Sequence, residues 1–278
     1  MSPSGRLARL LGMAGDARPA PRTLVVVAHP DDEVIGAASL LPRLGHAAFV
    51  HVTDGSPPDL ADARAAGYDT REAYAAARRR ELLAALALAG IGPEQARTLD
   101  IPDQHASFEL VRITLALLEL IWELRPEVLL THAYEGGHPD HDATAFAAHA
   151  ARALLAATGD VAAPLVAELA GYHAGNDGAM RTGEFLPARG RPTVTVMLDD
   201  AARDLKRRLF AEFATQARVL EAFAIGAERF RPAPRYDFSR PPHAGRLFYE
   251  RFEWGVTGER WRALAADASA RLGIAEPA

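Results

Sequence analysis

The sequence predicts an α/β fold: a Rossmann-like, mostly parallel sheet flanked by helices and followed by an irregular C-terminal extension. Apolar runs of β-forming residues recur along the chain, and they have the length and composition of strands buried on both faces. Segments with helical periodicity lie between these runs. Strands that alternate with helices are typical of a parallel sheet, and no internal repeat interrupts the alternation.

The elements follow from these patterns in chain order. The expected strands cover residues 23–29, 47–55, 127–133 and 191–200, with weaker candidates at 98–103 and 165–173. The expected helices cover residues 34–44, 70–89, 108–124, 142–157 and 201–223. The last of these has Leu205, Leu209 and Phe213 near one stripe, which is typical of a helix packed on a core.

One hydrophobic core can serve a chain of 278 residues, so we expect a single domain over 1–278. Residues 1–22 are expected to form a flexible lead-in, because their end is rich in Pro and Arg. Residues 224–278 are rich in Pro, Arg and aromatic rings and are expected to form the irregular extension. Its rings could stack on a sugar, but packing that closes the domain is the simpler interpretation.

Composition narrows the classes of function. The net charge of −5 without a basic stripe argues against a nucleic-acid partner. The absence of cysteine excludes disulfides and thiolate metal sites, so any metal must be held by His, Asp or Glu. No stretch has the length of a signal peptide core or a membrane span, which favours a cytoplasmic protein without a membrane partner.

A His-Pro-Asp triplet occurs twice, each time directly after an expected strand. The first lies in AHPDDE at residues 28–33 and the second in HPDH at residues 138–141. Proline and acidic residues are favoured in the first turn of a helix, so the two segments could simply begin helices. That interpretation leaves the histidine before each proline unexplained.

A metal site explains the pair, because loops at the carboxyl ends of parallel strands converge on one crevice. His29 and Asp32 can point at one ion across a strand-to-helix turn, and His141 can enter from the second loop. Two imidazoles and one carboxylate leave an open position, which is the pattern of catalytic zinc sites.

Three further residues are candidates for catalysis beside that metal. Asp31 adjoins a ligand without being one, so it is free to handle a proton. His138, one helical turn before His141, can donate to a developing oxyanion. Asp140 lies between them and can orient an imidazole.

AHPDDE followed by HPDH resembles the LmbE-like, or PIG-L-type, zinc-dependent N-deacetylases, from residue 23 to about 149. The resemblance implies a Rossmann-like fold, zinc on His29, Asp32 and His141, Asp31 as general base and His138 as stabiliser of the transition state. In a mycothiol-pathway relative a tyrosine stands where this chain has Gly136, so no tyrosine role is carried over.

Weaker candidates concern substrate binding. Arg78 and Asp103 occupy positions that resemble substrate-contacting ones in the family, although a solvated helix face would also explain Arg78. His173 ends an expected strand and is a further candidate, but single histidines are usually structural.

These observations predict a zinc-dependent hydrolase that removes the N-acetyl group from an amino sugar or glycoside-like small molecule with metal-activated water. The sequence leaves open whether Zn²⁺ or Fe²⁺ is used and whether the chain forms a homo-oligomer. One alternative is a metal-dependent hydratase of an unsaturated carboxylic acid, which would need a cationic clamp from the arginines at 78–80. Another is a non-catalytic metal- or sugar-binding protein, in which a general base such as Asp31 beside the ligand set would have no role.

Overall fold

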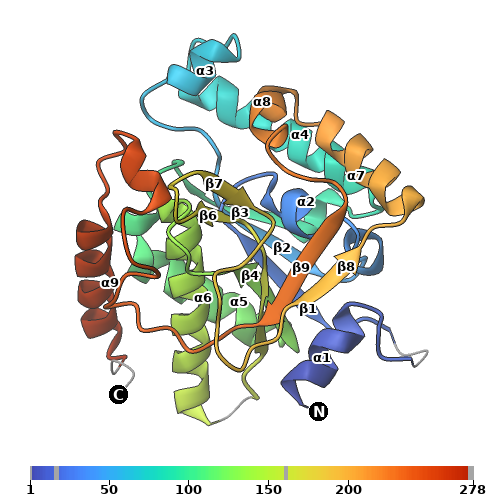
Figure 1. The fold of residues 1–278 in the computed structure, drawn as a ribbon, viewed down its shortest axis with the longest axis vertical. Helices are drawn as coiled ribbons and strands as arrows, with labels where there is room; N and C mark the ends of the chain where they lie inside the picture. The colour runs from blue at the N-terminus through green and yellow to red at the C-terminus, as the bar shows by residue number, and fades with distance from the viewer. Residues whose placement is uncertain (1, 16–18, 160–161, 275–278) are drawn as a thin grey trace.

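A seven-stranded sheet forms the centre of the protein, in strand order β3-β2-β1-β4-β5-β9-β8. The computed structural model describes residues 2–15, 19–159 and 162–274 (Figure 1). The strands are β1 (Thr23–Val27), β2 (Ala48–Thr53), β3 (Ala96–Ile101), β4 (Val128–His132), β5 (Leu165–Leu169), β8 (Val194–Met197) and β9 (Ala227–Pro232). The first five are parallel and the last two join antiparallel, which confirms the predicted fold class.

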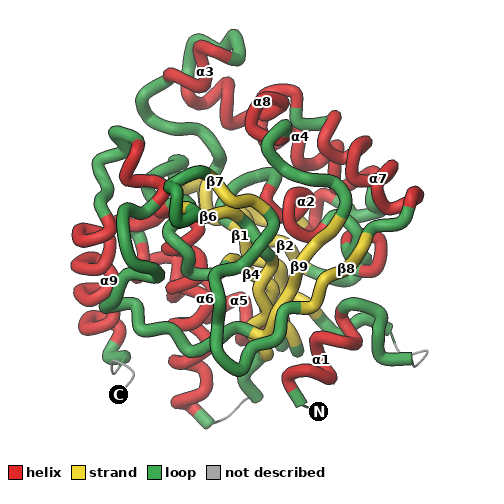
Figure 2. The backbone as a smooth tube through the Cα atoms, in the orientation of Figure 1, coloured by secondary structure: helices red, strands yellow, loops and turns green. Residues whose placement is uncertain are grey.

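Helices cover both faces of this sheet (Figure 2). They are α1 (Pro3–Leu10), α2 (Asp32–Ala37), α3 (Ala61–Ala65), α4 (Arg71–Leu88), α5 (Leu110–Leu124), α6 (Pro139–Thr158), α7 (Asp200–Ala211), α8 (Ala217–Leu220) and α9 (Gly258–Leu272). A separate hairpin of β6 (Tyr172–Ala174) and β7 (Met180–Thr182) follows β5. Within the described residues, no helix is both long and apolar enough to cross a membrane.

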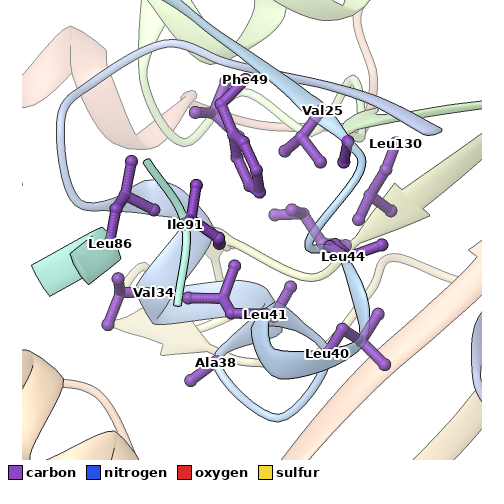
Figure 3. Close-up of a cluster of buried hydrophobic side chains, with 14 of the residues drawn as sticks. Val25, Val34, Ala38, Leu40, Leu41, Leu44, Phe49, Leu86, Ile91 and Leu130 are labelled. Carbon is purple, nitrogen blue, oxygen red and sulfur yellow. The ribbon is translucent and has the colours of Figure 1, made fainter. Parts of the chain in front are cut away.

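Alternation along β1 divides the core into two clusters. Val25 and Val27 pack with Phe49 and Leu86 on one face, as Figure 3 shows for part of that cluster. Leu24 and Val26 belong to the cluster on the other face, with side chains of α5 and α6. Successive strand residues point to opposite faces, so a continuous apolar run is what a strand covered on both sides requires.

The two ends of the chain are more ordered than the sequence indicated. The lead-in contains α1, which Ser2 caps and whose Leu7 and Leu10 are buried. A helix with one apolar face is stabilised by packing, and the Pro/Arg content did not reveal that face. Residues 16–18 of the lead-in lie outside the described part.

The expected irregular extension, 224–278, also contains regular structure. It contributes β9 to the sheet, and α9 is anchored by fully buried Trp261, whose indole Nε1 donates to Pro139 O at 3.2 Å. Most of the intervening segment, 233–257, has no regular structure apart from a short 3₁₀ turn. The helix expected over 201–223 ends at Ala211 and resumes as α8, because Phe213 leaves the helical conformation and is buried in the core.

A buried ion pair ties α7 to the sheet. Lys206 Nζ lies 2.9 Å from Glu228 Oε1 and donates to Ile35 O at 2.7 Å. Both side chains are 1% exposed. Glu228→Ala would leave a buried ammonium without its carboxylate, so we expect the free energy of unfolding to fall by about 3–5 kcal/mol. Urea denaturation measures it, and a loss below about 1 kcal/mol would contradict this role for the pair.

Candidate active site

The side chains of His29, Asp32 and His141 converge at the carboxyl ends of β1 and β4. His29 Nδ1 lies 3.2 Å from His141 Nε2 and 3.3 Å from Asp32 Oδ2, and His141 Nε2 lies 3.2 Å from Asp32 Oδ1. One potential ligand atom from each residue falls within 4.8 Å of the others. The two His-Pro-Asp segments thus meet, as the parallel sheet requires.

The chemistry of this donor set fits a divalent cation. The outer nitrogen of His29, Nε2, lies 3.0 Å from Asp103 Oδ1 and 3.5 Å from Asp140 Oδ2. A proton on Nε2 leaves the lone pair of Nδ1 directed at His141 and Asp32, and such carboxylate partners commonly orient ligating histidines. Two imidazole nitrogens and a carboxylate, facing one another in a buried site, are donors that Zn²⁺ accepts.

His132, the last residue of β4, also belongs to this site, and sequence reasoning assigned it no role. Its ring stacks on His141 at 4.0 Å, and its Nε2 lies 3.2 Å from Asp32 Oδ2. Nε2 also accepts a hydrogen bond from Ala28 N at 3.0 Å. Burial, followed by the charge of His141, lowers the pKa of His132 to about 4. Its position at the end of a predicted strand beside the motifs was the available signal.

Asp31 is held by a residue for which we expected another role. Arg78 Nη2 donates to Asp31 Oδ2 at 3.0 Å and to Pro30 O, while Nη1 donates to Gly55 O at 2.9 Å. The buried Arg78 side chain is thus committed to the loop, which does not support the substrate contact expected for it. Burial raises the pKa of Asp31 to about 6, with Arg78 lowering it and Asp32 raising it further.

His138 caps α6 and faces the same site. Its Nδ1 accepts a hydrogen bond from Asp140 N at 3.2 Å, so the proton of a neutral imidazole lies on Nε2. Burial, followed by the charge of His29, lowers the pKa of His138 well below its usual value, which keeps the ring neutral. Its ring centroid is 4.5 Å from that of His29. His138 is therefore placed as a neutral donor beside the three convergent residues.

Carboxylates of the motifs also hold the loops. Asp140 accepts hydrogen bonds from Gln104 N at 2.6 Å and Ala106 N at 3.0 Å, and its Oδ2 lies 3.5 Å from His29 Nε2. Asp142 Oδ1 accepts from Glu135 N and Gly136 N, both at 3.1 Å. Glu33 Oε2 lies 3.1 Å from His51 Nε2, and both side chains are fully buried. These acidic side chains, which lie in or next to the two motifs, therefore help to hold the two loops in place.

Of the two other predicted substrate residues, Asp103 lies in the site and His173 does not face it. Asp103 Oδ1 lies 3.0 Å from His29 Nε2, so its carboxylate contacts an imidazole of the site. In the β6 strand the ring of Tyr172 faces His141, at 5.2 Å. Adjacent strand residues point to opposite sides, so His173 faces away, and its Nδ1 bonds to Ala174 O. Sequence reasoning missed Tyr172, which no motif marks.

Gly137 allows the hairpin to approach the second motif. A Cβ atom there would lie 1.9 Å from Tyr172 O, a distance no side chain can accept. The glycine before HPDH is therefore needed for the contact that places Tyr172 over His141.

The C-terminal segment supplies an aromatic wall beside His138. The Trp254 ring lies 4.6 Å from the His138 ring, and Phe252 stacks on Trp254 at 4.4 Å. Phe252 is 42% exposed, whereas Tyr236 and Phe238 pack against Tyr134. The extension thus contains both packing rings and a partly open pair at the site.

The fold and these convergent groups define an α/β protein with a candidate metal centre at the carboxyl ends of its parallel strands. Residues 24–152 match the family model described as PIG-L: GlcNAc-PI de-N-acetylase. The match covers just under half of the chain, and over that segment it confirms the resemblance to the LmbE-like, or PIG-L-type, family.

Related sequences are named as deacetylases. The 1D-myo-inositol 2-acetamido-2-deoxy-alpha-D-glucopyranoside deacetylase of Salinispora arenicola is 33% identical over 149 residues, which cover 44% of this chain and 47% of that protein. A protein of the same name from Catenulispora acidiphila is 36% identical over 154 residues, which cover 45% and 49%. The chain therefore spans about half the length of the curated relatives it matches.

Solved structures share the fold. A deacetylase of teicoplanin biosynthesis has a TM-score of 0.59 at 18% identity, covering 78% of this chain and 99% of its own. A pseudoaglycone deacetylase for an antimicrobial reagent has a TM-score of 0.57 at 25% identity, covering 78% and 98%. The 4-carboxy-2-hydroxymuconate hydratase of Pseudomonas putida reaches 0.53 at 20% identity, covering 77% and 98%. Because a hydratase shares the fold, the reaction must be argued from the site.

Proposed function

We propose that the protein is a metal-dependent de-N-acetylase of an N-acetylated amino sugar or glycoside-like small molecule. The observation that carries the proposal is the oriented Asp31 carboxylate beside a complete ligand set, His29, Asp32 and His141. A zinc ion, when bound there, would lower the pKa of a water molecule and polarise the acetyl carbonyl. The names of the sequence relatives support the same class of substrate.

The side chains account for the proton and charge movements of this reaction. Arg78 occupies Asp31 Oδ2, and the structure gives Asp31 Oδ1 no partner among the described residues, so Oδ1 is free to take a proton from the attacking water. His138 donates a hydrogen bond from its Nε2 proton to the acetyl carbonyl oxygen, where negative charge develops when water attacks the carbon. The amine then leaves with a proton returned from this pair of groups, giving acetate and the free amine.

The hydratase alternative lacks its carboxylate clamp. Arg78 is committed to Asp31 and two carbonyls, and Arg79 Nη2 donates to Ala96 O at 2.5 Å. Arg80 is exposed on α4. None of the three arginines expected to serve is available beside the convergent ligands.

The direct test is acetate release from a panel of N-acetylglucosaminides, including a myo-inositol glycoside, with metal analysis of the same sample. We expect acetate and free amine in equal amounts from at least one member. Hydration of an unsaturated acid without any acetate release would contradict the proposal and support the hydratase alternative.

His138→Ala should retain the metal and lower kcat by about 10²–10³-fold, the usual loss for one oxyanion donor. His46→Ala is the matched control, because His46 is exposed and precedes β2, at the opposite end of the sheet from the carboxyl ends where the motifs lie. Kinetics and metal content would be measured together on both variants. Loss of metal from His138→Ala would make His138 a ligand and contradict the assignment.

Trp254→Ala should raise KM by about 3–10-fold with little change in kcat, since a stacked ring contributes about 0.5–1.5 kcal/mol to contact with an apolar face. Trp122→Ala is the control, because Trp122 is also partly exposed but lies on α5 against Arg125. An unchanged KM for every cleaved substrate would show that the aromatic wall of Trp254 and Phe252 does not contribute to substrate binding.

A further inference from the structure

A cavity of about 540 Å³ lies on the α6 side of the sheet, away from the convergent motifs. Its walls come from α1, α6, α9 and the segment after β9, which Figure 1 shows crossing α6 on its way to α9. The α6 residues that line it begin at Phe146, and His149 lies eight residues after His141, about 12 Å along the helix axis. None of the proposed ligands or catalytic residues lines it.

The rim of this cavity carries an excess of positive charge. Four arginines line it: Arg6, Arg152, Arg191 and Arg235. Among the described residues, none of these four has an ion-pair partner. The lining carboxylate, Asp237, is already paired with Arg240 at 3.0 Å and accepts from Ser239.

Arg6, Arg152 and the neutral ring of His149 lie close enough for the two arginine charges to act on their neighbours. Burial, followed by the charge of Arg6, lowers the pKa of Arg152. Burial, followed by the charge of Arg152, lowers the pKa of His149 to about 4. The Nε2 atom of His149 and the Nε atom of Arg6 are also buried without a hydrogen-bond partner in the described chain. Like charges held together without a counter-charge are destabilising, and a bound anion would relieve this.

Much of the rest of the cavity wall is apolar, although Ser239 and Ser269 also line it. Phe146, Phe238 and several alanines line it. Tyr236 donates its hydroxyl to Glu168 Oε1 at 2.6 Å, so this tyrosine also presents mainly its ring. A cavity of this volume with apolar walls and a few charged groups has the usual build of a small-molecule site.

We propose that this cavity is a second ligand site, separate from the catalytic centre, for a small organic anion that carries a phosphate or carboxylate group on an apolar ring. The arginines bind the anionic group, and the rings of Phe146, Phe238 and Tyr236 contact the apolar ring of the ligand. Guanidinium groups suit this task because their planar donors match the oxygen atoms of phosphate and carboxylate.

Phenyl phosphate is the probe for this site, with inorganic phosphate and phenol as its charged and apolar halves. Isothermal titration should show saturable binding of one phenyl phosphate per chain, tighter than either half. Arg6→Gln with Arg152→Gln should weaken it by at least about tenfold, because both charged donors are lost. Arg207→Gln with Arg208→Gln is the control, since both arginines are exposed on α7.

Two further variants distinguish binding in this cavity from binding at the catalytic centre. Ala153→Phe keeps all four arginines but fills part of the cavity, so it should also weaken binding. His141→Ala should leave binding unchanged, because His141 does not line the cavity. Binding that is lost only in His141→Ala would place the anion at the catalytic centre and overturn the proposal. Binding that Arg6→Gln with Arg152→Gln leaves intact would overturn it as well, and neither result would affect the proposed deacetylation.

Discussion

His29→Ala, Asp32→Ala and His141→Ala should each reduce the bound metal from about one ion per chain to a small fraction of that. Each variant removes one of three ligand atoms that lie within 4.8 Å of one another. Changes outside the ligand set cost 10–100-fold in metal affinity, so we expect losses of at least about 10²-fold here, with activity falling in parallel. Metal analysis and competition with a chelating dye measure the loss without relying on turnover.

His132→Ala provides an informative comparison with these three variants. His132 contacts Asp32 and stacks on His141, yet it lies outside the proposed ligand set. The His132→Ala variant should therefore lose less metal affinity than any of the three ligand variants. Full metal occupancy in all three ligand variants would eliminate the proposed centre.

Asp31→Asn should retain the metal and the fold while kcat falls by about 10²–10⁴-fold, the usual range for a lost general base. An Asn can still accept the hydrogen bond from Arg78, which also remains bonded to Pro30 O and Gly55 O. It cannot accept the proton of the attacking water. The measurement is single-turnover acetate release at matched metal content.

Asp200→Asn is the matched control for this variant, because Asp200 also lies at the start of a helix but its side chain is fully exposed and pairs with Arg203. It should leave kcat unchanged. An Asp31→Asn enzyme with near wild-type kcat would remove Asp31 as the base, whatever the metal content.

Much of the parallel part of the fold could be predicted because β1, β2 and β4 are covered on both faces. The apolar run at β1 and the helices that follow each strand are visible in the sequence without any knowledge of contacts. Strand β9 was harder to predict than β8, because three of its six residues are charged and a long irregular segment follows it. Helix α9 is stabilised largely by tertiary contacts of Trp261, and its local pattern does not show them.

The same distinction holds for the site: some of its residues could be predicted from local spacing, and others depend on tertiary packing. His29, Asp32 and His141 could be predicted because short-range spacing and the parallel sheet suffice to bring them together. The positions of Arg78 and Tyr172 depend on how α4 and the β6 hairpin pack over the loops, which no local spacing encodes. The family resemblance predicted a substrate contact for Arg78, and an arginine on a helix face gives no local sign of the buried carboxylate that it contacts.

The central claim is that Asp31 and the three proposed ligands together remove an acetyl group from nitrogen. The most direct measurement is acetate and free amine released from an N-acetylglucosaminide by the metal-loaded wild type, alongside Asp31→Asn at equal metal content. We predict equal amounts of both products from the wild type and a loss of at least about 10²-fold in Asp31→Asn. A metal-loaded wild type that releases neither product from any N-acetylated amino sugar tested would contradict the account.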